Sequence, residues 1–219
     1  MSLPAQAYDG NWMEDGDSRF DPAFAYQDGN LYFRYLNSHF LQAGPHGSGK
    51  TISFRRPSRV RKAVSGNTTT QIEARTDAQI AANPGLKFAF IGGGVNDIRT
   101  GQDPVYVSAA KASSIVGKYA TAGYLGGIWA GPECNGENGA GTAACQAFDS
   151  AVAPVVIAHS GWVYLSMVNL VALALWPTFN PNNLIIGPLT TPDTTPGVHP
   201  NSWGSAQDAK IFRMQVTWS

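Results

Sequence analysis

The sequence has little charge and no excess of either sign. Only 14% of its 219 residues are charged, and 15 basic side chains balance 15 acidic ones. A neutral chain has no overall attraction to nucleic acid or to an anionic membrane, which argues against nonspecific phosphate binding as its main role. The chain is instead rich in small and polar residues, with 24 glycines. Such a composition is more typical of secreted, surface or virion proteins than of cytosolic enzymes.

Long hydrophobic runs and a recognisable signal peptide are also lacking. The longest uncharged stretch covers residues 150–192, but His159, Asn169 and several prolines interrupt it, so we expect no membrane span. Residues 1–9 contain no basic segment followed by an apolar one, and no intact signal peptide is visible. The composition nevertheless favours a secreted, periplasmic, surface or virion-associated protein.

Cysteine is scarce, and its placement leaves two interpretations open. Cys134 and Cys145 flank a loop rich in Gly and Asn. A disulfide there would restrain a segment with little hydrophobic content and would indicate an oxidising compartment. Two free thiols are the equal alternative. No metal-type spacing of Cys and His surrounds the pair, and we predict neither a metal nor an organic cofactor.

Strand and helix signals alternate along the chain. The predicted strands span residues 11–13, 59–64, 86–91, 125–130 and 162–168. The predicted helices span residues 31–41, 68–82, 106–119, 142–152 and 205–214. Units of this length imply a parallel sheet covered by helices on both faces. We therefore predict one α/β domain over residues 1–219, a three-layer α/β/α sandwich of flavodoxin-like type with a mostly parallel five-stranded sheet.

Four short motifs are spaced along this pattern. They are Gly-Asp-Ser at 16–18, Val-Ser-Gly-Asn-Thr-Thr at 64–69, Gly-Val-Asn-Asp at 94–97 and Gly-Val-His-Pro-Asn at 197–201. Gly-Asp-Ser alone is common, whereas the third motif is the most specific because it follows an apolar strand. Active sites of open parallel sheets lie outside the carboxyl ends of the strands, so Ser18, Gly66 and Asn96 are expected on one rim. The second motif also allows a simpler interpretation, a glycine turn followed by Asn67 as a helix N-cap.

In this order, the motifs resemble the four marker blocks of the SGNH (GDSL-type) hydrolase family, over residues 11–212. The resemblance implies the fold predicted above and a serine hydrolase acting on ester bonds. It makes Ser18 the nucleophile and His199 the base. It also implies an oxyanion hole formed by the backbone N–H groups of Ser18 and Gly66 and the side-chain amide of Asn96. Asp17 and Asp97 are expected to fix the two turns.

The sequence departs from the family pattern in two places. Family members usually carry an aspartate three residues before the catalytic histidine, where this chain has Pro196. Asp193 could orient His199 if residues 194–196 bulge outward; a Ser-His dyad supported by a backbone carbonyl and a catalytically weak domain are the alternatives. The strand before Ser18 also contains Glu14 and Asp15, where the family usually has apolar residues.

A competing motif lies at residues 44–51. These residues fit the phosphate-binding pattern G-x-x-x-x-G-K-[ST], with Lys50 as the phosphate ligand. A phosphate-binding loop of this type follows a buried strand and opens a helix, whereas this segment follows a predicted helix. We therefore interpret it as a Gly-rich loop and rank nucleotide hydrolysis last.

These observations favour an esterase acting on small acyl esters, most of all O-acetyl groups on carbohydrate. Lipolytic activity on short acyl chains stays open. A noncatalytic glycan-binding module with the same fold, on a cell surface or virion, is the alternative that Pro196 motivates. The expected partner is a small-molecule or polysaccharide ester, and the sequence leaves the oligomeric state open. Trp129 could line a sugar-binding cleft, although core packing is the favoured role.

Overall fold

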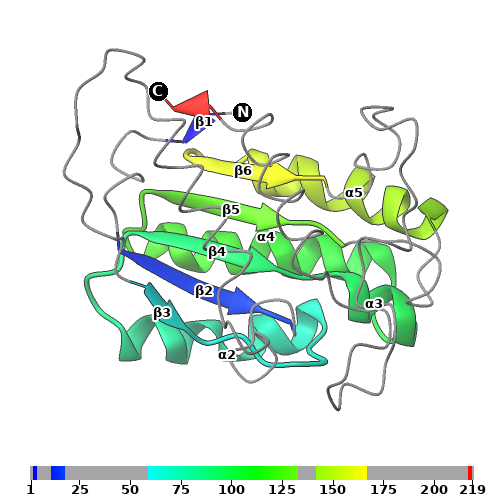
Figure 1. The fold of residues 1–219 in the computed structure, drawn as a ribbon, viewed down its shortest axis with the longest axis horizontal. Helices are drawn as coiled ribbons and strands as arrows, with labels where there is room; N and C mark the ends of the chain where they lie inside the picture. The colour runs from blue at the N-terminus through cyan, green and yellow to red at the C-terminus, as the bar shows by residue number, and fades with distance from the viewer. Residues whose placement is uncertain (1, 4–10, 18–58, 133–141, 167–216, 219) are drawn as a thin grey trace, which may run out of the picture.

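A computed structural model of the protein describes residues 2–3, 11–17, 59–132, 142–166 and 217–218. The strands in these residues are β1 (Ser2–Leu3), β2 (Trp12–Gly16), β3 (Arg59–Arg61), β4 (Phe88–Gly92), β5 (Gly126–Ala130), β6 (Trp162–Leu165) and β7 (Thr217–Trp218). The helices are α2 (Thr69–Ala82), α3 (Val95–Thr100), α4 (Val105–Thr121) and α5 (Thr142–Ile157). Figure 1 shows their arrangement.

Five of the strands form one parallel sheet in the order β3-β2-β4-β5-β6. Every residue of β2, β4 and β5 is buried, as expected for central strands of a parallel sheet. The register pairs Trp12 with Phe88 and Gly16 with Gly92, so β2 and β4 end at the same level. The predicted five-stranded parallel sheet is therefore confirmed. Strands β1 and β7 form a separate parallel pair.

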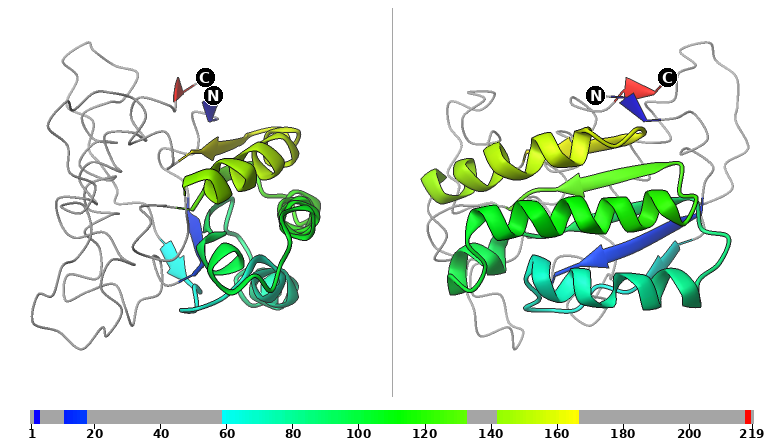
Figure 2. Two further views of the ribbon diagram at one scale, coloured as in Figure 1. Left: turned by 90° about the vertical axis from the view of Figure 1, so that its right-hand side faces the viewer. Right: turned by 180° about the vertical axis from the view of Figure 1, so that it is seen from behind.

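Helices α2, α4 and α5 cover the same face of this sheet (Figure 2). The chain moves across the sheet in one direction from β3 through β4 and β5 to β6, with one of these helices in each connection. Right-handed crossovers made in one direction place their helices on one face. The helices predicted at 31–41 and 205–214 lie outside the described residues.

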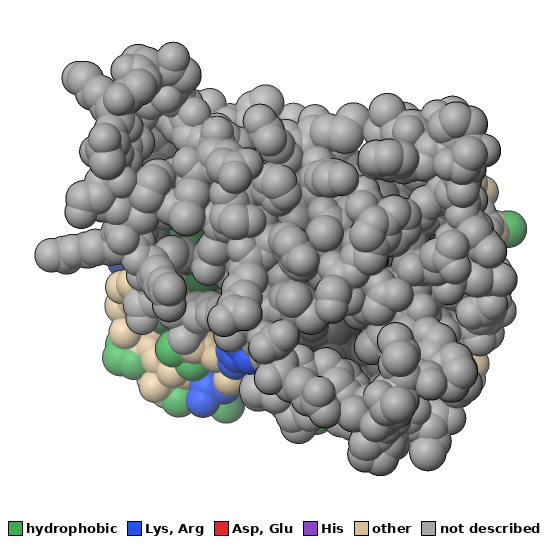
Figure 3. Space-filling view, in the orientation of Figure 1, with side chains coloured by type: hydrophobic (Ala, Val, Ile, Leu, Met, Phe, Trp, Pro, Cys, Tyr) green, Lys and Arg blue, Asp and Glu red, His purple; other side chains and the backbone are tan. Residues whose placement is uncertain are grey.

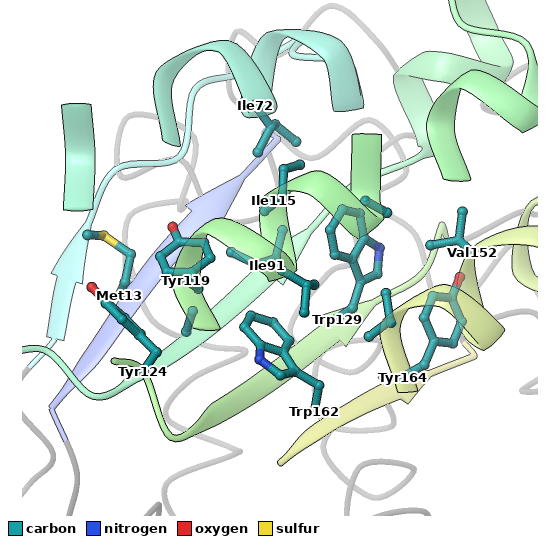
Figure 4. Packing of buried hydrophobic residues seen from close by; sticks show 14 of the residues in the cluster. Met13, Ile72, Ile91, Ile115, Tyr119, Tyr124, Trp129, Val152, Trp162 and Tyr164 are labelled. Carbon is teal, nitrogen blue, oxygen red and sulfur yellow. The ribbon is translucent and has the colours of Figure 1, made fainter. Parts of the chain in front are cut away.

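The core forms where these helices meet the sheet (Figure 4). Trp129 of β5, Tyr119 of α4 and Ile91 of β4 are fully buried within it. Burying one such side chain contributes about 2–3 kcal/mol to folding. The favoured core role of Trp129 is confirmed, so this tryptophan does not line a surface cleft.

Several element boundaries differ from the predicted ones. Strand β3 ends at Arg61, although the backbone N–H groups of Lys62 and Val64 still donate to Glu14 and Gly16 of β2, at 2.7 and 3.0 Å. Helix α3 was not predicted. The N-cap of α2 is Thr68 rather than Asn67. The Thr68 N–H donates to the Gln71 side chain at 2.9 Å, which supports the helix start.

Helix α5 runs beyond its predicted end at residue 152. It continues to Ile157 although Pro154 lies inside it. Val152 and Val156 are one helical turn apart and both fully buried. Their packing in the core offsets the backbone hydrogen bond that a proline removes.

Candidate functional site

The first three motifs converge at the carboxyl ends of β3, β2 and β4. The backbone N–H of Asp17 donates to the Gly92 carbonyl at 2.9 Å, and the N–H of Val64 donates to the Gly16 carbonyl at 3.0 Å. Residues 16 and 17, which directly precede Ser18, are therefore bonded on one side to the second motif and on the other side to β4. The third motif follows β4. Ser18, Asp193 and His199 themselves lie outside the described residues, as does the competing motif with Lys50.

Gly66 occupies a tight turn on this rim. The Asn67 N–H donates to the Val64 carbonyl at 3.3 Å, which closes a four-residue turn. Gly66 is its third residue and has φ +78°, a conformation that favours glycine at this position. Nothing lies within 4 Å of the place where a Cβ would be, and the residue is exposed. Backbone conformation rather than packing therefore requires glycine here.

Asn96 lies in the first turn of α3 with only 6% of its surface exposed. Its side-chain Nδ2 donates to the main-chain oxygen of Asn67 at 3.1 Å. An amide nitrogen carries two hydrogens, so this bond uses one and sets the direction of the other. The structure thus brings Asn96 to the residue that directly follows Gly66.

Gly94 starts the helix that carries Asn96. It has φ +118°, and a Cβ at this position would lie 2.5 Å from the ring of Phe148 in α5. Only glycine allows this close contact without displacing the aromatic side chain. The third motif is therefore packed directly against α5.

Asp97 ties the third motif to two other helices. Its carboxylate accepts hydrogen bonds from the Thr69 N–H at 3.1 Å, from the Thr69 hydroxyl and from the Ser108 hydroxyl at 2.9 Å. Burial raises the pKa of Asp97, and the bonds from Thr69 and Ser108 act in the opposite direction. These contacts agree with the expected role of Asp97 in fixing its turn.

The two unusual acids of β2 each contact an arginine. Glu14 accepts a bond from Arg61 Nε at 2.9 Å, and Asp15 accepts one from Arg75 Nη2 at 2.6 Å. Burial raises the pKa of the fully buried Asp15, while the Arg75 charge lowers it. The sequence did not predict either pair, and its only signal was two acids in a strand position where apolar residues are usual. Figure 3 shows basic side chains at the surface near β3, at the lower left.

A second polar cluster joins the end of β6 to the middle of α5. The Tyr164 hydroxyl donates to Asp149 Oδ1 at 2.5 Å, and the Ser166 hydroxyl donates to Asp149 Oδ2. Sequence reasoning did not identify this cluster either. It follows strand β6, which is separated from β2 by β4 and β5, so it is remote from the chain leading to Ser18.

Other kinds of site find little support in the described residues. They contain no group of three His, Cys, Asp or Glu side chains that could hold a metal ion. None of the helices described is both long and apolar enough to cross a membrane. A groove of about 500 Å³ between α2 and α4 is lined by residues including Asp77, Ile80 and Lys118. These lie toward the C-terminal ends of both helices, away from the rim of the three motifs.

Comparison with known proteins identifies the fold. No protein-family model matches the sequence, and no curated protein matches it by sequence. Solved structures do match, among them the alpha/beta hydrolase LAE5 from the metagenome of Lake Arreo in Spain. This match has a TM-score of 0.68 and 18% identity and covers 94% of each chain.

Two further solved structures are similar over nearly the whole chain. A catalytic mutant of Axe2, an acetylxylan esterase from Geobacillus stearothermophilus, has a TM-score of 0.68 and 18% identity and covers 98% of this chain and 96% of its own. A member of the lipolytic G-D-S-L family from Veillonella parvula has a TM-score of 0.65 and 14% identity and covers 92% and 95%. At such low identity these likenesses show the fold, and they confirm the one expected from the four motifs.

Proposed function

Because this chain has the SGNH hydrolase fold, we propose that it is a serine esterase that hydrolyses small acyl esters. One observation carries the proposal. The amide of Asn96 is bonded to Asn67, next to the Gly66 turn, on the rim where the chain leads into Ser18. This arrangement supports an oxyanion hole built from the first three motifs.

In the proposed reaction, the Ser18 hydroxyl oxygen attacks the ester carbonyl carbon while His199 accepts its proton. The carbonyl oxygen becomes an oxyanion as the tetrahedral intermediate forms. When this intermediate collapses, the bond to the leaving alkoxide breaks and His199 protonates that alkoxide. Water then attacks the acyl-enzyme by the same route, which releases the carboxylic acid and restores Ser18.

The oxyanion would be stabilised by three N–H donors. We assign these three donors to the backbone N–H groups of Ser18 and Gly66 and to the side-chain amide of Asn96. Gly66 is exposed on the rim, and Asn96 is held in a fixed direction by its bond to Asn67. A preorganised donor of this kind contributes about 3 kcal/mol to transition-state stabilisation.

Orientation of His199 is assigned to Asp193. A carboxylate bonded to the imidazole would set its tautomer and stabilise the imidazolium that forms during attack. We expect Asp193→Asn to lower kcat while the fluorophosphonate-reactive serine is retained. An unchanged rate would eliminate Asp193 and leave the Ser-His dyad.

For the substrate, we propose O-acetyl groups on carbohydrate. The similarity to an acetylxylan esterase and the small, polar composition of the chain support this choice. The alternative is lipolytic activity on short acyl chains, which the similarity to a lipolytic protein supports. We also propose a secreted, periplasmic, surface or virion-associated location. The disulfide-bonded state of Cys145 supports this, because disulfides persist in oxidising compartments.

The test is hydrolysis of p-nitrophenyl acetate by the wild-type protein, Ser18→Ala and a matched serine variant. Ser150→Ala is that control, because Ser150 is exposed on α5 and its hydroxyl donates to the Gln146 carbonyl of the same helix. We expect turnover in the wild type and in Ser150→Ala and none in Ser18→Ala. No turnover in any of the three proteins would favour the noncatalytic glycan-binding module.

A second experiment distinguishes the substrates. Acetate release from acetylated xylan is compared with hydrolysis of p-nitrophenyl esters of increasing chain length. The proposal expects release from the polysaccharide and a rate that falls as the acyl chain grows. A rate that rises with chain length, without release from xylan, would indicate the lipolytic alternative.

A further inference from the structure

Arg75 contacts two separate motifs of the proposed site. It lies on α2, and 19% of its side chain is exposed. Its Nη2 donates to Asp15 Oδ1 at 2.6 Å and to the Gly16 carbonyl at 2.8 Å. Its Nη1 donates to the Asn67 side-chain oxygen and to the Gln71 carbonyl at 3.2 Å. One guanidinium thus bridges the end of β2 and the turn that contains Gly66.

These contacts extend to the third motif through Asn67. The side-chain oxygen of Asn67 accepts from Arg75, and its main-chain oxygen accepts from Asn96. Gly16 is two residues before Ser18, and Asn67 directly follows Gly66. Arg75 is therefore bonded two residues before Ser18 and one residue after Gly66, the two residues whose backbone N–H groups are assigned to the oxyanion hole.

The chemistry of these contacts requires arginine. Asp15 is fully buried, so its carboxylate needs a positive partner. A guanidinium supplies this charge and several N–H donors in a rigid planar arrangement. The flexible ammonium group of a lysine would supply the charge without fixing the directions to Gly16 and Asn67.

We propose that Arg75 is a positioning residue that holds the turn before Ser18 and the Gly66 turn at the spacing the oxyanion hole needs. This role rests on the esterase function proposed above. In this role Arg75 acts through Asp15, Gly16 and Asn67 rather than by direct contact with the substrate. We expect the loss of Arg75 to lower the rate of acyl transfer, because small displacements of catalytic groups lower rates strongly.

A purely structural role is the alternative, in which Arg75 only neutralises the buried Asp15. The double variant Asp15→Asn/Arg75→Gln separates the two roles. It removes both charges of the pair, so the electrostatic cost of an unpaired buried acid disappears. The hydrogen bonds from Arg75 to Gly16 and Asn67 are still lost.

The experiment measures kcat and KM for p-nitrophenyl acetate well below the melting temperature of each variant. We expect Arg75→Gln to lower kcat by about 10–100-fold with little change in KM. Arg75→Lys should recover only part of this loss, and the double variant should stay as slow as Arg75→Gln. Wild-type kcat in Arg75→Gln, or its recovery in the double variant, would overturn the positioning role.

Arg61→Gln is the matched control. Arg61 pairs with Glu14, the neighbouring acid of the same strand, at 2.9 Å. Its removal should lower thermal stability and leave kcat within about twofold of the wild type, since the lost pair joins β2 to β3 and includes neither Gly16 nor Asn67. An equal loss of kcat in Arg61→Gln and Arg75→Gln would show a general effect of destabilising β2, against the proposal.

Hydrogen exchange separates failure of this inference from failure of the esterase function. Peptides covering residues 65–68 are compared between the wild type and Arg75→Gln by mass spectrometry. Faster exchange is expected in the variant, because the turn loses its bond to Arg75. Unchanged exchange would overturn the inference even in a protein without esterase activity, whereas absent turnover in the wild type would count against the proposed function alone.

Discussion

Asn67 links the parts of the proposed site at the scale of single residues. It follows Gly66, accepts a bond from Asn96 through its main chain and accepts another from Arg75 through its side chain. Each of these contacts comes from a different element, α3 or α2. The geometry around Gly66 is therefore set by specific hydrogen bonds as well as by the turn itself.

The amide of Asn96 gives the most direct prediction at this scale. We expect Asn96→Ala to lower kcat by about 10²–10³-fold, because one preorganised oxyanion donor is removed. KM should change little, since the lost bond strengthens only in the transition state. Steady-state kinetics with p-nitrophenyl acetate measures both constants.

Asn83→Ala is the control for this substitution. Asn83 also donates through its side-chain amide, to the Gln79 carbonyl at 2.8 Å, but at the far end of α2. It should reduce stability slightly and leave kcat unchanged. Similar rates for the Asn96 and Asn83 variants would remove Asn96 from the oxyanion hole.

At the scale of elements, close contacts between helices hold the third motif in place. Phe148 of α5 packs against Gly94 at the start of α3. Asp97 of the same short helix accepts bonds from residues of α2 and α4. Three longer helices thus support the six residues that carry Asn96.

A pair of glycine substitutions tests this packing. Gly94 and Gly85 both have positive φ, +118° and +91°, but only Gly94 has a neighbour within 4 Å of the place where a Cβ would be. An alanine at either position would therefore have a strained backbone, but only Gly94→Ala would also clash with Phe148. We expect Gly94→Ala to be less stable than Gly85→Ala by about 1–3 kcal/mol in urea unfolding. Equal unfolding midpoints would contradict the predicted clash.

Glu73 connects α2 to α4. Its carboxylate oxygen Oε1 lies 2.5 Å from Lys118 Nζ and accepts a hydrogen bond from the Ser114 hydroxyl at 3.0 Å. The bond from Lys118 is the largest cause that lowers the pKa of Glu73 below its usual 4.5. A lowered folded-state pKa stabilises the protein above that usual value, and the contribution is lost as pH falls through the folded-state pKa.

Glu73→Gln should therefore have a pH-dependent effect. At neutral pH we expect a loss of about 0.5–1 kcal/mol, the usual range for a partly exposed pair. In acid, below the usual pKa of 4.5, the difference from the wild type should shrink, because protonation of the wild-type carboxylate removes this contribution. Thermal unfolding at both pH values measures this, and a difference that grows in acid would contradict the assignment.

Local signals predicted the elements that carry the site. The apolar run at 86–91 and the helical spacing at 68–82 and 106–119 lie within a few residues of β4, α2 and α4. Helix α3 was missed because six residues are too few to show a helical period. The contact of Asp15 with Arg75 joins residues 60 apart, and no local pattern reveals such a pair. Ser18, Asp193 and His199 stay predictions from the motifs.

At the scale of the whole molecule, sheet topology brings the motifs together. Strand β2 lies between β3 and β4, so the segments that follow three adjacent strands meet on one rim. Motifs distant in sequence become neighbours because all three strands run in the same direction. The proposed active site is thus a consequence of the parallel sheet.

The disulfide gives a prediction about overall stability. Cys145 is fully buried in α5 and disulfide-bonded, and the only other cysteine of the chain, Cys134, lies outside the described residues. We expect Cys145→Ala to lower the free energy of unfolding by about 2–4 kcal/mol under nonreducing conditions. A strong reductant should remove most of the difference from the wild type. Identical stabilities without reductant would show that the bond contributes nothing.

The most direct measurement of the central claim is covalent labelling with a fluorophosphonate, followed by peptide mapping by mass spectrometry. Wild type, Ser18→Ala and His199→Ala are treated in parallel. The account predicts a single adduct on Ser18 in the wild type, no adduct in Ser18→Ala and much slower labelling in His199→Ala. No adduct on the wild type, or an adduct on another serine with hydrolysis retained in Ser18→Ala, would contradict it.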